Sequence, residues 1–379
     1  MIHQVKGEAI RSYAVKVLGK HIELGVNGYR MDDEQAWDVL LKSASEYRSV
    51  YSVCGELRET VHHNTIREHL NERFDVCQLQ ADEIAQNKAL AATVPQMIRG
   101  RAVEIAIDFH DEPSYAQDAE IRTYVCRSKA KAGTTRFFRV ATAYVMQAGQ
   151  RVTVAMRYVL PEYTKLDVLQ TLLVRVHQCG VKIKCLYLDK GFCSTLIIRF
   201  LQDHTYKAII ACPIRGKTGG TQALCVGRKS YTTAYTFGDG TEAMLCCVRT
   251  IIRHQHDPQQ VKWLLYVTIN VKWPPLKVKK RYRRRFGIEA SYRHMRQLRL
   301  FSTSRNPALR FFFYGLAFLL LNIWVLFCCK CLRHPGTHRI DKTLLPLTQF
   351  KAFIRRAVEQ LRGVIDSIPI FLNPAVLKL

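Results

Sequence analysis

Hydrophobic residues follow two different periods along this chain, and the change between them divides it near residue 98. Through residues 1–98 they recur every three or four positions, and neither an alternating pattern nor a proline occurs before Pro95. Residues 33–47, DEQAWDVLLKSASEY, form one predicted helix, with Asp32 or Asp33 as its cap. We therefore expect a mainly helical N-terminal region.

A helix-turn-helix is predicted near residues 44–74 of this region. Asn64, a good N-cap, precedes the segment TIREHLNERF, and a short helical segment lies just before it. In such a motif the second helix faces DNA. Arg67 and Arg73 are therefore candidate DNA-binding residues, and residues 1–98 are interpreted as a DNA-binding region.

Beyond residue 98 the chain alternates between apolar β-strand patterns and amphipathic helices. In chain order we read strand AVEIAIDFHD, strand FFRVATAYVMQ, strand RVTVAMRYVLP, helix KLDVLQTLLVRVHQCG, strand IKCLYLDKGF, helix CSTLIIRFLQDH and strand KAIIACPI. Three antiparallel strands followed by parallel crossovers, βββαβαβ, is the order of a ribonuclease H-like core. We expect an α/β fold whose core begins at residues 99–214, with Asp108 and Asp189 adjacent at two strand ends.

Residues 215–276 lose the helical pattern and alternate in the manner of strands, which predicts a β-rich insertion in the core. Trp263 alternates with apolar neighbours there, so packing inside the insertion is the favoured interpretation. Stacking of Trp263 on an unpaired DNA base is the alternative.

Residues 277–300, KVKKRYRRRFGIEASYRHMRQLRL, hold one acidic residue, Glu289, among many lysines and arginines. At about 100° per residue, Tyr282, Arg285, Glu289 and Arg296 fall on one side of a single helix and should face outward together. A basic helix whose glutamate only relieves charge repulsion is the simpler alternative.

Residues 311–329 carry no charge and are long enough to span a bilayer. They directly follow the basic helix and form the only such run, so we interpret them as a buried helix completing the core within residues 277–332. A membrane anchor is the alternative. Residues 333–379 are predicted to be a helical C-terminal tail.

Composition points to a polyanionic partner. The formal net charge is +26, from 57 Lys and Arg against 31 Asp and Glu, which favours nucleic acid first and an anionic membrane second. The thirteen cysteines show no disulfide framework and no signal peptide is evident, so we expect reduced thiols and a cytoplasmic, DNA-associated protein. Cys328, Cys329, Cys331 and His334 match no common zinc spacing and are interpreted as structural.

Asp108, Asp189 and Glu289 have the order and spacing of a two-metal site. Phosphodiester chemistry uses two divalent cations about 3.5–4 Å apart, held by carboxylates. Two aspartates at neighbouring strand ends and a glutamate on a helix crossing them can converge on such a pair. Asp111 is the nearest rival to Asp108.

At this point the sequence resembles the insertion-sequence DDE transposases whose last acid lies in a Y-x2-R-x3-E-x6-K signature. Tyr282, Arg285, Glu289 and Arg296 match it, with Arg in place of the final Lys. The residues DKGF from Asp189 resemble the motif around the second aspartate of that family, and a β-rich insertion precedes the glutamate, as in that family. DFHDEP around the first aspartate departs from the family pattern.

This resemblance implies a transposase that cleaves the terminal inverted repeats of its element and joins the 3′-hydroxyl to target DNA. It implies that the three acids are catalytic and bind Mg²⁺, for which Mn²⁺ can substitute, and that members form dimeric synapses on double-stranded DNA. It also implies phosphate contacts by Tyr282, Arg285 and Arg296; the neighbouring Arg293, Lys190 and Trp263 are further DNA-binding candidates. A catalytically inactive DNA-binding derivative is the first alternative, and a membrane-anchored basic protein the second.

Overall fold

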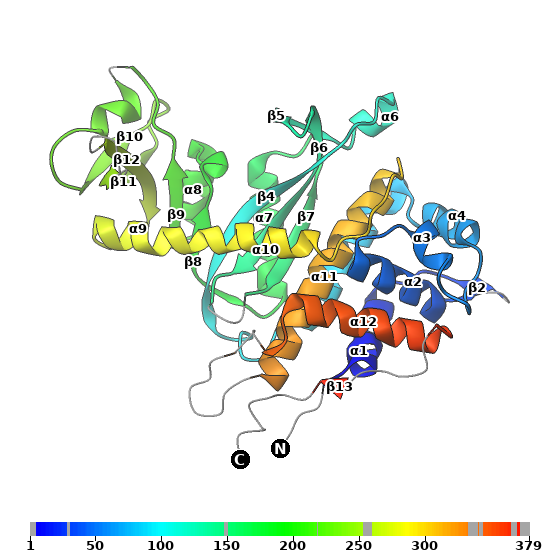
Figure 1. Cartoon of the computed structure of the whole chain (residues 1–379). Coiled ribbons are helices and arrows are strands. Elements are labelled where there is room, and N and C mark those ends of the chain that lie inside the picture. The colour runs from blue at the N-terminus through cyan, green and yellow to red at the C-terminus, as the bar shows by residue number, and fades with distance from the viewer. Residues whose placement is uncertain are drawn as a thin grey trace, which may run out of the picture.

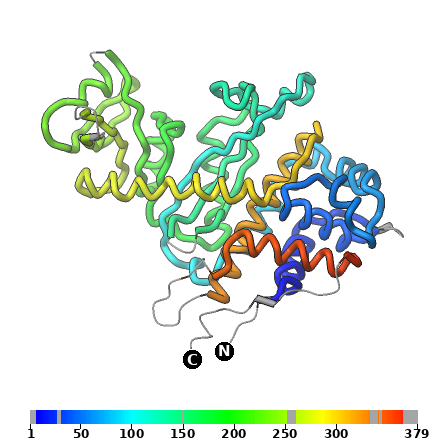
Figure 2. Tube along the Cα trace, viewed as in Figure 1, coloured from blue at the N-terminus to red at the C-terminus, as the bar shows by residue number. Residues whose placement is uncertain are grey.

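The computed structural model describes residues 5–28, 31–147, 151–217, 219–252, 260–332, 340, 344–364 and 370–371. A single large sheet runs through the middle of the molecule (Figure 1). The tube view in Figure 2 shows the 215–276 region at one end of this sheet and the N-terminal helices at the other. A long helical rod, formed by residues 275–296, crosses between them.

The centre of the sheet has the predicted core topology. Its elements are β4 (Ala102–Pro113), β6 (Thr134–Val145), β7 (Thr153–Val159), α7 (Lys165–Gln178), β8 (Lys182–Leu188), α8 (Thr195–Asp203) and β9 (Ala208–Cys212). β4 pairs antiparallel with β6, which pairs antiparallel with β7. β8 pairs parallel with both β4 and β9. The predicted βββαβαβ order and ribonuclease H-like fold class are therefore confirmed.

Between β4 and β6 the chain forms two short elements that the pattern did not predict. They are α6 (Ala119–Arg122) and β5 (Cys126–Lys131), which pairs with the start of β6. Ala132 and Gly133 join the two strands with φ values of 52° and 76°. Positive φ at both central residues gives a tight hairpin that follows the twist of the strands.

The region predicted as a β-rich insertion extends the core sheet. It contains η3 (Gly220–Leu224), β10 (Tyr231–Thr236), β11 (Glu242–Ile252) and β12 (Gln260–Ile269). These strands form an antiparallel meander, and β12 pairs antiparallel with β9. The insertion is thus fixed to the core by backbone hydrogen bonds.

The N-terminal region is mainly helical, as predicted. Its helices are α1 (Gly7–His21), α2 (Asp33–Glu46), α3 (Val50–Cys54), α4 (His63–Arg73), η1 (Val76–Gln78) and α5 (Leu79–Thr93). Asp32 accepts a hydrogen bond from the Gln35 backbone and completes a capping box at the start of α2. The helix-turn-helix interpretation of α3 and α4 stays a prediction.

The two ends of the chain meet in this region. The fully buried Asp38 of α2 accepts hydrogen bonds from Arg11 of α1, at 2.6 Å from Nε, and from Arg362, at 2.8 Å from Nε. Arg362 directly follows α12 (Leu347–Leu361), the described helix of the predicted tail. Two short strands, β1 (Val5–Lys6) and β13 (Ile370–Phe371), also pair antiparallel. Another small hairpin joins β2 (Asn27–Gly28) and β3 (Met31–Asp32).

The predicted helix at residues 277–300 is a rod of three pieces. α9 (Pro275–Arg283) continues through a 3-10 turn, η4 (Arg284–Phe286), into α10 (Gly287–Arg296). A 3-10 turn has three residues per turn instead of 3.6, so it rotates the side chains that follow it. The side-chain directions predicted for one ideal helix therefore change within this rod.

The apolar run lies in α11 (Pro307–Cys331) and is buried, as predicted. This helix is long and apolar enough to span a membrane, yet 94% of an apolar 18-residue stretch within it is buried inside the molecule. Its buried Asn322 accepts a hydrogen bond from Thr153 N at 2.9 Å and donates to Thr153 O and Thr93 Oγ1. A polar side chain that is fully paired with β7 and α5 identifies α11 as a core helix.

The thirteen cysteines all lie in the described ranges, and no disulfide joins them there. Cys328 and Cys329 are buried in α11, and His334 lies outside the described residues. Within the described ranges no group of three or more His, Cys, Asp or Glu side chains is placed to hold a metal ion. Nine of the cysteines are buried and pack as small apolar side chains, whereas Cys77 is exposed.

Candidate active site

Asp108 and Asp189 are neighbours because of the register between two parallel strands. Ile107 of β4 pairs with Leu188, the last residue of β8, and an aspartate follows on each strand. β8 ends there because residues Lys190–Phe192 form the 3-10 turn η2. The strand end predicted at Asp108 is wrong, because β4 continues to Pro113 alongside β6. Asp108 therefore lies in the middle of β4, beside the point where β8 ends.

The Arg285 guanidinium reaches both aspartates and Glu289. Its Nη1 donates to Asp108 Oδ2 at 2.7 Å, and its Nη2 lies 3.5 Å from Asp189 Oδ1 and 3.7 Å from Glu289 Oε1. The structure thus brings together the three acids proposed from the sequence. The Arg285 side chain is 5% exposed, whereas those of Asp189 and Glu289 are 34% and 54% exposed. Solvent therefore reaches the cluster from the side of these two acids.

Arg285 and Tyr282 face the sheet. The Tyr282 hydroxyl donates to the Leu188 carbonyl at 3.0 Å, and the Arg285 guanidinium lies 5.5 Å from the centroid of the Tyr282 ring. The outward orientation predicted for these two residues is wrong, whereas Glu289 and Arg296 are exposed as predicted. The buried side of α9 and α10 faces the core, and Tyr282 and Arg285 lie on that side. Their phosphate contacts stay a prediction.

Asp108 carries the clearest electrostatic signature of the cluster. Burial raises the pKa of Asp108 to about 6, because loss of water outweighs the attraction of Arg285, and the negative charge of Asp189 adds to the rise. Three carboxylates face one guanidinium, so the negative charge of the cluster is only partly balanced. Such a site favours binding of further positive charge.

One arginine in the rod and one just beyond it bind two other acids of β4. Glu104, Asp108 and Glu112 are separated by even steps along the strand, so their side chains share the face under the rod. Arg284 Nη1 donates to Glu104 Oε2 at 2.8 Å, and Arg299, just beyond α10, forms an ion pair with Glu112. The rod is therefore fixed to β4 on both sides of the cluster. The period-2 spacing of these acids was visible in the sequence and was missed.

Tyr292 is a further residue of the site that the sequence analysis missed. Its hydroxyl lies 2.8 Å from Thr142 Oγ1 and 3.1 Å from the Asp108 carbonyl oxygen, to which it donates. Its ring centroid lies 4.9 Å from that of the buried His110. Tyr292 thereby fixes α10 against β4 and β6 at the level of Asp108. Its place on the apolar stripe, three residues after Glu289, was the available signal.

Carboxylates are the ligands that Mg²⁺ prefers, and the approach of all three to one cation fits a divalent-metal site in donor chemistry. As they stand, the Arg285 guanidinium lies between them, and no three acids among the described residues form a ready metal site. Asp111, the rival to Asp108, is engaged elsewhere. It accepts two hydrogen bonds from Arg139, at 2.6 and 2.9 Å.

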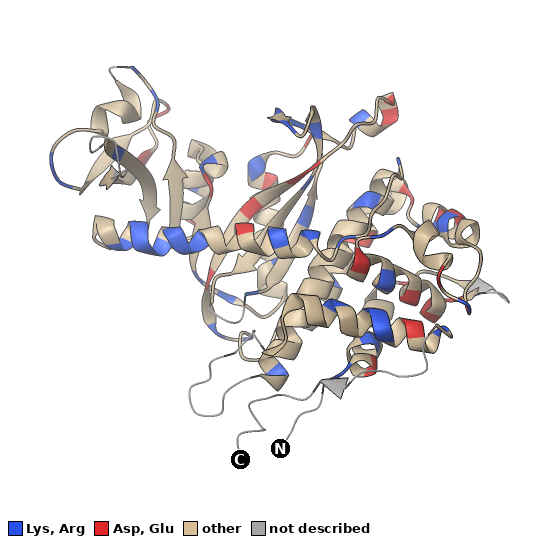
Figure 3. Ribbon diagram, viewed as in Figure 1, with Lys and Arg blue, Asp and Glu red and all other residues tan. Residues whose placement is uncertain are grey.

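Basic side chains flank Glu289 on the exposed side of the rod. Figure 3 shows Lys and Arg along much of α9 and on α10. The exposed ones are Lys277, Lys280, Arg283, Arg293 and Arg296. Lys190, next to Asp189, is also exposed. These exposed cations flank Glu289 and follow Asp189 in the chain, an arrangement suited to a polyanion.

The other predicted DNA-binding residues have different surroundings. Arg67 on α4 is exposed. Arg73 donates to the Glu23 carbonyl at 2.7 Å and to Asp82 at 3.0 Å, which ties α4 to α5. Trp263 is half-buried, with its ring edge-on to Tyr231 at 6.3 Å, in agreement with packing inside the insertion. Among the contacts of the described residues, none joins Arg73 or Trp263 to the three acids.

A family model described as "Transposase DDE domain" matches residues 125–323. The match includes Asp189, Glu289 and the insertion, and it begins after Asp108. No curated protein matches the chain. Because the matched residues make up more than half of its length, the chain belongs to the transposase DDE domain family.

Proposed function

We propose that the chain is a transposase that binds the terminal inverted repeats of its mobile element, cleaves the ends and joins the freed 3′-hydroxyl to target DNA. Family membership implies a metal-dependent transposase activity on DNA. The observation that carries the finer proposal is the approach of Asp108, Asp189 and Glu289 to the single guanidinium of Arg285. The exposed basic residues around these acids support DNA as the substrate.

In this proposal Asp108, Asp189 and Glu289 hold Mg²⁺, with Mn²⁺ as a substitute. When bound, such ions activate the attacking oxygen and ease departure of the leaving oxygen. Arg293 and Arg296, beyond Glu289, bind phosphates of the DNA strand and orient it over the acids. The ion pairs that fix the rod on β4 keep Glu289 at a constant distance from the two aspartates.

Recognition of the ends is assigned in this proposal to residues 1–98. The exposed Arg67 on α4 supports it, because a cation on the second helix of such a motif can reach DNA. A homodimer that holds two ends together is the assembly implied by the resemblance. Both assignments are tested by binding measurements with DNA that contains one end or two.

The proposal is tested with linear DNA that carries the inverted repeats flanking the coding region. Purified chain is incubated with this DNA and Mg²⁺, and new 3′ ends are mapped at nucleotide resolution. We expect breaks at the repeat boundaries and none in a DNA with scrambled repeats. Binding to the repeats without any break, in Mg²⁺ and in Mn²⁺, would identify the chain as a DNA-binding derivative without catalysis.

A further inference from the structure

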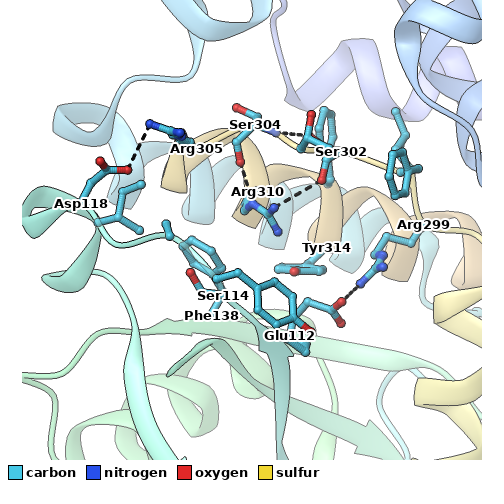
Figure 4. Close-up of a pocket in the computed structure, with 18 of the residues that line it drawn as sticks. Glu112, Ser114, Asp118, Phe138, Arg299, Ser302, Ser304, Arg305, Arg310 and Tyr314 are labelled. Carbon is cyan, nitrogen blue, oxygen red and sulfur yellow. Dashed lines mark hydrogen bonds and ion pairs between the residues drawn. The ribbon is translucent and has the colours of Figure 1, made fainter. Parts of the chain in front are cut away.

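A cavity of about 800 Å³ lies where β8 and β9 end, and two cysteines, Cys193 and Cys212, are among the residues that line it. Lys190 lines it too, directly after the second aspartate of the cluster. The cavity at the end of β4, shown in Figure 4, is lined by charged and aromatic side chains instead, such as the paired Arg299 and Glu112. The two thiols are reactive groups beside the three acids, and the proposed cleavage reaction does not use them.

The two cysteines are neighbours because β8 and β9 are adjacent parallel strands. Leu188, the last residue of β8, pairs with Ile210 of β9, and Cys212 ends that strand two residues later. From Leu188 the chain passes through Asp189 and the turn η2 to Cys193. There the thiols of Cys193 and Cys212 are in hydrogen-bonding contact. Two residues distant from each other in the chain thus form a thiol pair at one edge of the core.

The surroundings of the two thiols give them different reactivity. Cys193 is half-buried, whereas Cys212 is buried. The hydrogen bond from the Cys212 thiol lowers the pKa of Cys193, and together with the positive charge of Arg215 it outweighs the effect of burial. The same hydrogen bond, with burial, raises the pKa of Cys212. Because the thiolate is the reactive form of cysteine, Cys193 is the more reactive partner and Cys212 is placed to react with its oxidised form.

The segment that carries Cys193 is also joined to both aspartates of the cluster. The turn η2 begins directly after Asp189 and ends directly before Cys193. Within it the fully buried Phe192 stacks on Phe109, with ring centroids 4.6 Å apart. Phe109 N in turn donates to Asp108 Oδ1 at 2.9 Å. A displacement of Cys193 is therefore passed on to the backbone at both aspartates.

We propose that Cys193 and Cys212 form a reversible disulfide on contact with a hydroperoxide, and that this bond shifts Asp189 and slows cleavage. An S–S bond is about 2 Å long, shorter than any hydrogen bond between two sulfurs, so the two cysteines have to move closer. Cys212 is held in the sheet, where it pairs with Leu265 of β12, so the segment of Cys193 moves. The effect on cleavage rests on the proposed function, whereas formation of the bond does not.

The disulfide forms in two steps. The Cys193 sulfur attacks the terminal oxygen of the hydroperoxide, the O–O bond breaks, and an alcohol leaves with the thiol proton, so that Cys193 becomes a sulfenic acid. The Cys212 sulfur then attacks the Cys193 sulfur, the S–O bond breaks, and the hydroxyl group leaves as water with the Cys212 proton. The two thiols lose two electrons in total, and the hydroperoxide gains them. A dithiol reductant reverses the reaction by thiol–disulfide exchange.

Peptide mapping tests the bond itself, because trypsin places the two cysteines in separate peptides, residues 191–199 and 208–215. Reduced chain is treated with hydrogen peroxide, the remaining thiols are alkylated, and the digest is analysed by mass spectrometry with and without dithiothreitol. We expect the two peptides to be joined only in the oxidised sample without dithiothreitol. Linkage of either peptide to another cysteine, or a sulfenic or sulfinic acid at Cys193 without linkage, would overturn the pair.

Cleavage of end DNA with Mg²⁺, measured after the peroxide is removed, tests the consequence. Oxidation should slow wild-type cleavage about 10- to 100-fold, because a displacement of about 1 Å in an active site can cost about 100-fold, and dithiothreitol should restore the rate. Cys193→Ser, and Cys212→Ala as a second variant, should cut like reduced wild type and resist peroxide. Cys77→Ser removes the exposed cysteine and should stay as sensitive as wild type.

The outcomes separate this inference from the proposed function. If reduced wild type cuts the ends and no linked peptide forms after peroxide, the disulfide is wrong and the transposase proposal stands. If the link forms but cleavage is unchanged, or if Cys193→Ser stays sensitive to peroxide, the coupling to Asp189 is wrong. If reduced wild type does not cut, the proposed function falls, and the linked peptides still decide whether the disulfide forms.

Discussion

Two buried cations in this protein each face three carboxylates, and only one of these clusters resembles an active site. Lys42 Nζ of α2 lies 2.6 Å from Glu359, 3.1 Å from Glu46 and 3.2 Å from Glu56. Arg285 lies 2.7 Å from Asp108 but 3.5 and 3.7 Å from its other two acids. All three acids of the first cluster lie within 3.2 Å of its cation, whereas two acids of the second lie 3.5 Å or more from theirs.

The surroundings of the two clusters explain the difference. The Lys42 cluster joins α2, the segment after α3 and α12, so it holds the two ends of the chain together. The Arg285 cluster joins the middle of β4, the end of β8 and a helix, where the backbone fixes the aspartates and leaves Glu289 more than half exposed. A buried cation among acids is therefore common to both clusters, and the longer contacts of Arg285 distinguish the proposed active site.

The largest contrast is expected from removing the two cations. Lys42→Met leaves Glu46 and Glu359 facing each other in a largely buried place, and should destabilise the fold by about 3 kcal/mol. Arg285→Met should cost only about 1–2 kcal/mol, because Asp189 and Glu289 keep access to water. Urea unfolding of both variants measures this difference. Equal losses would mean that the two clusters are both structural.

Acid should reveal a further ion pair on the strand that carries Asp108. Burial alone would raise the pKa of Glu112, but a contact with His110 and the Arg299 guanidinium outweigh it and lower the pKa to about 2. Burial lowers the pKa of His110, so Arg299 supplies the charge near neutral pH. A lowered folded-state pKa stabilises the protein above the unfolded value near 4.5, and this stabilisation is lost as pH falls towards 2.

The expected contribution of Glu112 is about 2–3 kcal/mol above pH 5. Wild-type unfolding free energy should fall by that amount more than that of Glu112→Gln between pH 5 and pH 2. Parallel pH profiles for the two proteins would contradict the pairing.

Divalent metal should distinguish the clusters without any DNA. Millimolar Mn²⁺ should raise the melting temperature of wild-type chain by a few degrees, as expected for a ligand that binds only the folded state. The shift should disappear in Asp189→Asn and persist in Glu359→Gln, which alters the Lys42 cluster. Calorimetric titration with Mn²⁺ gives an independent check. A shift that survives Asp189→Asn would place the metal elsewhere.

The smallest predicted effect concerns the exposed cations near each cluster. Arg296→Ala should weaken DNA binding by about three- to tenfold and reduce the salt dependence by about one ion. Arg296→Lys should keep most of the affinity, because the charge is retained. Arg355→Ala removes a partly exposed cation beside the Lys42 cluster and should change neither quantity. Filter binding over a salt series measures both.

The sequence predicted the order of the core strands well because apolar periodicity is a local signal, although β4 extends past the end predicted at Asp108. The apolar runs ending near Asp108 and at Asp189 placed both acids at adjacent strands, which the register of Ile107 with Leu188 confirms. The helical N-terminal region, the insertion and the buried run in α11 were read from the same kind of pattern. In each case the spacing of apolar residues along one helix or strand indicates which of its side chains are buried.

The directions of Tyr282 and Arg285 could not be obtained from the same reasoning. A stripe drawn at 100° per residue assumes one ideal helix, and the 3-10 turn at Arg284–Phe286 breaks that assumption. A charged residue was also expected to face water, whereas Arg285 is buried and pairs with Asp108 on β4 and Asp189 just after β8. Pairings of this kind join residues distant in sequence, so no local pattern reports them.

Strand cleavage by a matched pair of glutamate variants tests the central claim most directly. Glu289→Gln and Glu359→Gln each neutralise a helix glutamate that faces a buried cation. With end DNA and Mg²⁺, Glu289→Gln should lose at least about 1,000-fold in rate while its melting temperature is unchanged. Glu359→Gln should melt earlier but cut within a few-fold of wild type. Near-wild-type cutting by Glu289→Gln, or cutting by wild type in chelator, would contradict the three-carboxylate site.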